Sequence, residues 1–187
     1  MLRGKTYEEV YNNFKWEIPK FYNIGVDVCD KWAGDKNRVA LISADPHGMD
    51  RQYTFRELKN TSNRLANALK AHDITRTDRV GILLSQRPET LISHIAVYKL
   101  GAIVVQLLTL FGPDAIEFRL DDSAAKAVIT DKENLSKIWE VKERLPGLKL
   151  IIAIDADKQE DAVDFWECVA KGSLDFTPLK PNPKTRQ

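Results

Sequence analysis

The sequence predicts an α/β protein with a doubly wound, mostly parallel sheet and helices on both faces. Strand-like and helix-like segments alternate from residue 38 to residue 172, with connections that are mostly a few residues long. Most of the strand-like segments are almost continuously apolar, which is typical of strands buried on both faces of a parallel sheet. With 187 residues, the chain is long enough to bury one sizeable core.

The first elements are a helix over residues 24–32 that ends at Gly34, and a buried strand in RVALISA (38–44). A polar loop leads to QYTFRELKNTSNRLANALKAH, where Thr54 and Glu57 have the spacing of a capping box. One face of the helix that follows is marked by Leu58, Ser62, Leu65 and Leu69.

The central elements begin with a strand in DRVGILLS (78–85) and a helix that has Pro88 in its first turn and ends at Gly101. AIVVQLL (102–108) is predicted to be a third buried strand, GPDAIEFRLDD (112–122) a helix and AKAVIT (125–130) a fourth strand.

Asp131 is placed to cap a helix over residues 132–145, which stops at Pro146 and Gly147. LKLIIAI (148–154) is predicted to be the fifth strand and DAVDFWECVAKG (161–172) the last helix. We therefore expect an N-terminal extension in residues 1–22, an α/β subdomain in 23–174 and a proline-rich linker in 175–187.

The composition points to a globular protein that binds small molecules or other proteins. Lys and Arg number 28 against 27 Asp and Glu, so the net charge of +1 gives no field that favours nucleic acid. The apolar runs are far shorter than the roughly 20 residues of a membrane span, and we expect none. Cys29 and Cys168 are expected to be buried free thiols, and together with the absence of a signal peptide they predict a cytoplasmic location.

The residues of common catalytic and metal sites are missing. The closest glycines, Gly25 and Gly34, are nine positions apart, so neither GxGxxG nor GxxxxGK[ST] occurs. The three histidines are widely separated, and we expect no metal site and no catalytic residue in this chain. Gly112 lies at a strand-to-helix turn, where it either serves the architecture alone or contacts an anion.

The sequences of three segments resemble those of the AMP-forming acyl-CoA synthetases, which belong to the adenylate-forming, AMP-binding superfamily. YTFRELKNTSNRLANAL resembles the first core motif of that family, and YKLGAIVVQLLTLFGPDAIEFRLDDSAAKAVIT resembles the second. FKWEIPKFYNIGVDVCDKWAGDKNRVALI is similar to the branch that handles short-chain, medium-chain and aromatic carboxylates, including those of fatty acid metabolism.

The resemblance implies a ligase that converts a carboxylate, ATP and coenzyme A (CoA) to acyl-CoA, AMP and pyrophosphate through an acyl-adenylate. ATP, Mg²⁺ and CoA are expected for the full-length enzyme. The catalytic motifs of the family would lie beyond Gln187, so the chain is expected to be an N-terminal fragment that needs no cofactor and is inactive alone. Two alternatives stay open: a truncated, non-enzymatic binding or scaffold module with the same fold, and an unrelated flavodoxin-like domain.

Mapped onto this sequence, the resemblance places a CoA-facing surface at Leu110, Phe111, Gly112 and Lys137. The family usually has proline where this chain has Gln106, which would put an amide into a strand predicted to be buried. We also expect the truncated face of such a fragment to expose apolar surface and to cause self-association.

Overall fold

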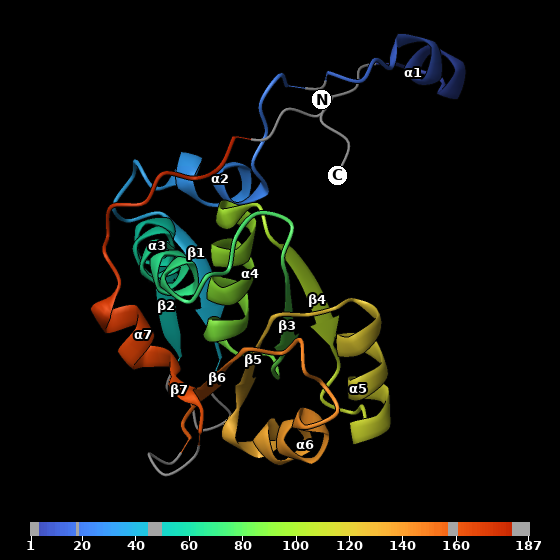
Figure 1. Ribbon diagram of the computed structural model, residues 1–187. Helices are drawn as coiled ribbons and strands as arrows, with labels where there is room; N and C mark the ends of the chain where they lie inside the picture. The colour runs from blue at the N-terminus through green and yellow to red at the C-terminus, as the bar shows by residue number, and fades with distance from the viewer. Residues whose placement is uncertain (1–3, 18, 45–49, 157–160, 181–187) are drawn as a thin grey trace.

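The computed structural model describes residues 4–17, 19–44, 50–156 and 161–180. Its centre is a five-stranded sheet in the order β4-β3-β5-β6-β7, and every adjacent pair of strands is parallel (Figure 1). The strands are β3 (Arg79–Leu83), β4 (Ile103–Leu107), β5 (Ala127–Asp131), β6 (Leu150–Ile154) and β7 (Val163–Asp164).

Helices cover both faces of this sheet and form two separate cores. The helices α3 (Phe55–Ala71), α4 (Pro88–Leu100) and α7 (Phe165–Lys171) lie on one face, and α5 (Pro113–Asp122) and α6 (Lys132–Lys142) on the other. Alternation along β3 sends Val80 and Ile82 into the first core and Leu83 into the second. The predicted doubly wound fold with a mostly parallel sheet is therefore confirmed.

The helix ends follow the local signals in the sequence. Thr54 and Glu57 form both hydrogen bonds of a capping box at the start of α3, and the side chain of Asp131 caps α6. Gly101 ends α4 in the left-handed conformation with φ 71°, which glycine adopts without steric penalty. These predictions rested on short-range chemistry and are confirmed.

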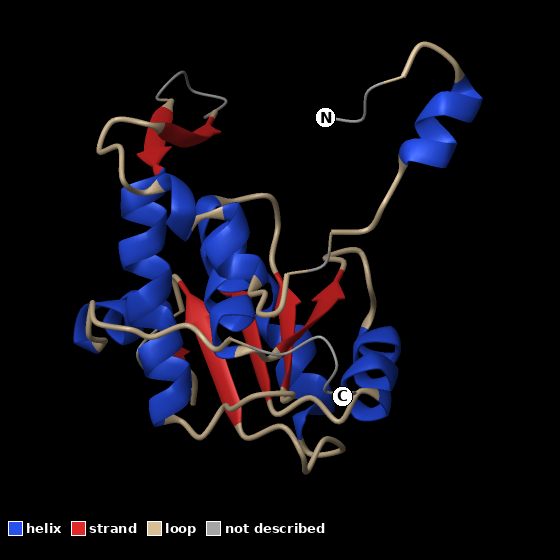
Figure 2. Cartoon of the chain, turned by 90° about the horizontal axis from the view of Figure 1, so that it is seen from above, coloured by secondary structure: helices blue, strands red, loops and turns tan. Residues whose placement is uncertain are grey.

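The predicted strand 38–44 is wrong in its sheet and in its burial. β1 (Val39–Ser43) pairs antiparallel with a short strand, β2 (Arg51–Thr54), in a hairpin separate from the parallel sheet (Figure 2). Val39 is 42% exposed and Ile42 is 58% exposed. β2 is close to β1 in the sequence, and this local pairing takes the place of the predicted pairing with the central sheet.

The predicted strand 102–108 is also wrong in its burial. β4 is the edge of the sheet, with β3 as its neighbour, so Ile103 and Gln106 lie exposed. The Gln106 amide therefore keeps contact with water, and its Nε2 also donates to the carbonyl oxygens of Ile82 (3.3 Å) and Leu107 (3.0 Å). The desolvation expected for this residue does not arise.

Two predicted helices are interrupted. Residues 24–32 form the short helix α2 (Ile24–Val28) and a 3₁₀ turn, η1 (Asp30–Trp32), because Cys29 between them has φ −130° and ψ −64°. Within the predicted helix 161–172, the two residues of β7 come before α7. The remaining helix, α1 (Tyr7–Asn13), has no buried residue and stands away from the sheet (Figure 1).

Within the described part of the chain, no helix has both the length and the hydropathy needed to cross a membrane. The two cysteines are free and buried, as predicted.

Candidate functional site

The strand order indicates that a ligand would bind at the carboxyl ends of the parallel strands. The chain passes from β3 to β4 on one side and then crosses to β5 on the other side of β3. In open α/β sheets, ligands bind at the carboxyl ends of the strands, near such a reversal of strand order. The loop after β4, the loop after β3 and the start of α6 lie at these carboxyl ends.

The loop after β4 holds three of the residues predicted to face CoA. Leu110 is 93% exposed. The Phe111 ring lies under the guanidinium of Arg119, whose Cζ is 4.1 Å from the ring centroid. Gly112 is the N-cap of α5, and an added Cβ would meet no atom within 4 Å. The loop therefore offers an open surface at the N-terminus of α5.

Lys137 reaches this loop from the second turn of α6. Its Nζ donates to the Thr109 carbonyl oxygen at 2.6 Å and to Asn134 Oδ1 at 2.9 Å. The Asn134 amide is held in turn by a hydrogen bond to Asp131 Oδ1 at 2.8 Å. The structure thus places Lys137 beside the loop of residues 110–112. Since an ammonium has three N–H donors, one donor is left for an anion.

An ion cluster joins residues that follow β3 and β6, the two strands on either side of β5, and sequence reasoning missed it. Arg87 Nε lies 2.9 Å from Glu89 Oε2, and its Nη2 lies 3.1 Å from Asp155 Oδ2. Burial opposes the charge on Arg87, but the hydrogen bonds to the two carboxylates outweigh it and raise the pKa of the guanidinium. The cluster ties the loop after β3 to the end of β6.

A second polar group, formed by His94, Tyr98 and Gln106, joins α4 to β4. His94 Nε2 lies 2.8 Å from Gln106 Oε1, and His94 Nδ1 lies 3.1 Å from the Tyr98 hydroxyl. The sequence signalled this group only through Gln106, the polar residue in an apolar strand.

A groove of about 770 Å³ lies between α2, β1 and α4. Its walls include four apolar side chains that are more than a third exposed: Ile24, Val28, Ile42 and Leu91. His94 and Tyr98 also line it. The groove is larger than a second hollow of about 440 Å³, which residues of α3 and α7 line.

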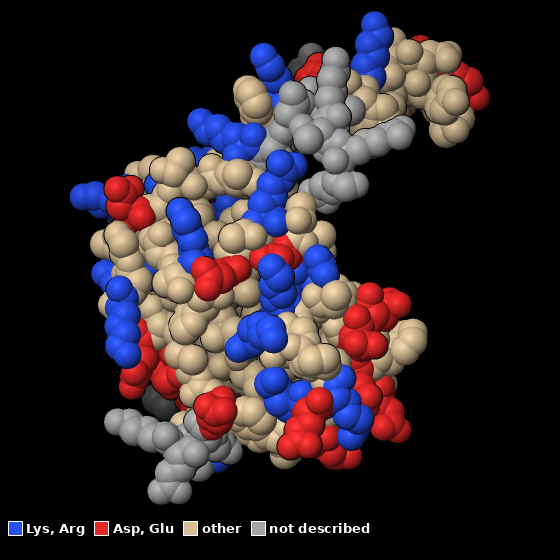
Figure 3. All heavy atoms as spheres, viewed as in Figure 1, with Lys and Arg blue, Asp and Glu red and all other residues tan. Residues whose placement is uncertain are grey.

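The described residues give no support to metal or phosphate-loop chemistry. None of them form a group of three or more His, Cys, Asp or Glu side chains suited to a metal ion, and His47 lies outside the described residues. Basic and acidic side chains are interspersed over the face seen in Figure 3, which matches the balanced net charge. The Lys137 loop, in contrast, offers an N–H donor to an anionic group.

Comparison with known proteins gives one consistent result. The family model described as "AMP-binding enzyme" matches residues 29–185. The chain is 33% identical over 183 residues to the acetyl-coenzyme A synthetase of Bacillus subtilis, covering 90% of this chain and 32% of that protein. It is 32% identical over 157 residues to the mitochondrial acyl-coenzyme A synthetase ACSM3 of Mus musculus, covering 79% of this chain and 27% of that protein.

Solved structures give the same picture. A Brucella canis acyl-CoA synthetase superposes with a TM-score of 0.85 at 29% identity, over 94% of this chain and 34% of that one. The anthranilate CoA ligase AuaEII, solved with anthranoyl-AMP, superposes with a TM-score of 0.79 at 28% identity, over 89% of this chain and 31% of that one. The chain spans about a third of the length of these relatives.

Proposed function

The chain belongs to the AMP-binding enzyme family, and from this premise we propose that it forms the N-terminal α/β unit of an AMP-forming acyl-CoA ligase. In that reaction the carboxylate attacks ATP to give an acyl-adenylate and pyrophosphate. The thiol of CoA then takes the acyl group and releases AMP. The match of residues 29–185 to the family, with relatives that are acetyl- and acyl-CoA synthetases, carries the proposal.

Within this reaction we assign the chain a supporting role. ATP and Mg²⁺ are expected for the full-length enzyme, and neither GxGxxG nor GxxxxGK[ST] occurs in this chain to hold their phosphates. The 187-residue chain is expected to be inactive alone, since adenylation needs oriented phosphate donors and a metal ion. An ATP–pyrophosphate exchange assay with acetate, butyrate and benzoate tests this point, and turnover by the isolated chain would overturn it.

The CoA-facing surface at Leu110, Phe111, Gly112 and Lys137 is part of the proposal. Lys137 supports it because two acceptors orient its ammonium and leave one donor for a phosphate of CoA. Titration calorimetry with CoA should show weaker binding by Lys137→Ala, by about tenfold for one charge-assisted hydrogen bond. Lys149→Ala removes another exposed lysine and serves as the control. Equal affinity of both variants would remove the assignment.

The apolar groove supports the proposed self-association of the 187-residue chain. Exposed apolar surface of this kind marks a site of contact, and a second protein chain is one partner that covers such surface. Sedimentation velocity over a range of concentrations should show dimers or larger species, and Leu91→Glu should reduce them. A monomer at all concentrations would count against this part of the proposal.

A cytoplasmic location fits the two buried free thiols, which need no oxidising compartment.

The reading frame after the codon for Gln187 separates the ligase from the alternative. A frame that continues into a Ser/Thr/Gly-rich loop and a lysine supports the ligase. A stop codon favours a non-enzymatic binding or scaffold module.

A further inference from the structure

Residues 173–180 form an extended segment that crosses the outer side of α3 and the end of α4, and we call it the strap. It contains neither helix nor strand. In Figure 1 it runs from α7 past α3 towards α2. An extended segment without sheet partners must satisfy its backbone groups elsewhere, so its hydrogen bonds show what holds it.

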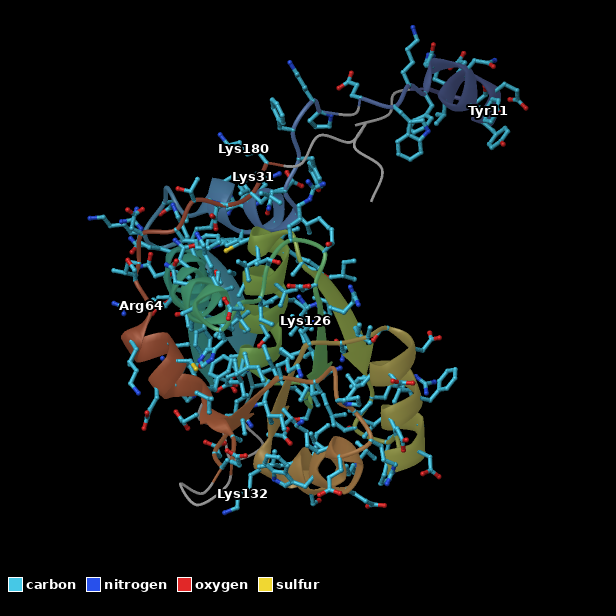
Figure 4. The ribbon with its side chains drawn as sticks, in the orientation of Figure 1. Tyr11, Lys31, Arg64, Lys126, Lys132 and Lys180 are labelled. Carbon is cyan, nitrogen blue, oxygen red and sulfur yellow. The ribbon has the colours of Figure 1, made fainter. Side chains whose placement is uncertain are left out.

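Side chains from one face of α3 bind the backbone carbonyls at the start of the strap. Asn63 Nδ2 donates to the Leu174 carbonyl at 3.0 Å. Asn67 Nδ2 donates to the carbonyls of Ser173 (2.8 Å) and Asp175 (2.9 Å). These two asparagines are four positions apart and therefore share a face of the helix. Arg64, labelled in Figure 4, adds bonds to the carbonyls just before the strap.

The far end of the strap is held at the end of α4. The Leu179 amide donates to the Lys99 carbonyl at 2.9 Å, and Asn23 Nδ2 donates to the Leu179 carbonyl at 2.8 Å. The Leu179 side chain lies where a Cβ on Gly101 would be, with its Cδ2 2.4 Å from that position. Both ends of the strap are therefore fixed by directed contacts.

Lys99 lies beneath this arrangement and is completely buried. Its Nζ lies 2.7 Å from Asp30 Oδ1 and donates to Ser62 Oγ at 2.9 Å and to Asn63 Oδ1 at 2.7 Å. An ammonium can only donate, so the amide oxygen of Asn63 must face Lys99. The NH₂ group of Asn63 then points at Leu174, which is the direction the strap requires.

We infer that Lys99 is a positioning residue that fastens the strap, through the Asn63 amide at one end and through its own carbonyl at the other. Lys99 also ties η1 to α3 and to the strap, because Asp30 in η1 is its ion partner. Segments around residues 30, 63 and 179, far apart in the chain, thus meet at one residue: the first two at the Lys99 ammonium and the third at its carbonyl. The role does not depend on the proposed ligase activity, and it determines where the chain stands at residue 180.

Hydrogen exchange measured by mass spectrometry on the whole 187-residue chain tests the inference. Asn63→Asp keeps an acceptor for Lys99 but places a carboxylate, which cannot donate, against the Leu174 carbonyl. Asn67→Asp removes both donors to the strap in the same way. In Asn63→Asp, the hydrogen-bonded strap amides of Asp175 and Leu179 should exchange about tenfold faster, as expected for one lost hydrogen bond. Asn67→Asp loses two hydrogen bonds and should accelerate their exchange further. Amides of β5 and β6 should not change.

Asn60→Asp is the matched control, since it makes the same chemical change on an exposed position of the same helix. Lys99→Met should accelerate exchange in the strap and in η1 together. Strap exchange in Asn63→Asp equal to that in Asn60→Asp would overturn the inference. A uniform acceleration over the whole chain would overturn it too, because it would report global destabilisation. If Lys99→Met does not fold, the two asparagine variants decide the outcome.

Discussion

Replacing Lys99 by methionine tests how much the buried ammonium stabilises the fold. Methionine has a similar length and no branch, so packing is largely kept. The change leaves the Asp30 carboxylate, which is nearly buried, without its ion partner at 2.7 Å. It also removes the donors to Ser62 and Asn63. Burial lowers the pKa of Lys99, and the hydrogen bond and charge of Asp30 act against that shift.

Breaking one partner of a buried ion pair costs about 3 to 5 kcal/mol. That is a large part of the roughly 5 to 15 kcal/mol that stabilises a typical domain. For a chain of this size, about 1 kcal/mol shifts the melting temperature by roughly 2 to 4 °C, so we expect a decrease of about 6 to 20 °C. Urea unfolding followed by circular dichroism should give the same loss with an unchanged m-value.

Two further variants show whether the loss comes from the pair. Lys171→Met breaks an exposed ion pair with Glu167 at 3.0 Å and should change the unfolding free energy by less than about 0.5 kcal/mol. The double variant Lys99→Met/Asp30→Asn removes both charges and should be less destabilised than the sum of the single variants. A loss below about 1 kcal/mol in Lys99→Met, or strict additivity in the double variant, would refute the reasoning.

Three other predictions concern stability. In a urea titration, Gly101→Ala should lower the unfolding free energy by about 1 to 2 kcal/mol, because φ is 71° and Leu179 occupies the Cβ position. Gly147→Ala is the control and should be near neutral, because its added Cβ would meet no atom within 4 Å. Thr54→Ala removes the capping box of α3 and should lower the melting temperature by an amount equivalent to about 1 kcal/mol. Burial raises the pKa of the Cys29 thiol to about 11 from 9.0, so the folded chain keeps a proton that the unfolded chain loses. Stability from this thiol is complete below pH 9 and is lost as the pH rises to 11, by about 2 to 3 kcal/mol relative to Cys29→Ala in unfolding titrations at each pH.

The elements that sequence reasoning placed correctly are those defined by local chemistry or by complete burial. The capping residues of α3 and α6 act within three positions of themselves. Every residue of β5 and β6 is buried, so an apolar run was a sufficient signal. The loop of residues 110–112 and Lys137 came from the family resemblance, and no pattern of residues revealed that Lys137 contacts Thr109.

The elements that sequence reasoning misplaced depend on partners distant in the chain. An apolar run can become a central strand, an edge strand or part of a hairpin. Strand order decides between them, and the residue pattern of a single segment does not reveal that order. β1 and β4 are both apolar runs, and each is half exposed for this reason. No role was predicted for Lys99, because nothing near it in the sequence indicates Asp30 as its partner.

Gln106 and Lys99 show how a polar residue within an apolar pattern should be interpreted. Both bond groups on another element: Gln106 bonds His94 on α4, and Lys99 bonds Asp30 and, on α3, Asn63. They differ in burial, and this difference decides their importance. Gln106 lies on an exposed edge, where water can replace a lost partner, so its removal should cost little. Lys99 is fully buried, where water cannot replace the ammonium, and the strap, η1 and α3 all depend on it.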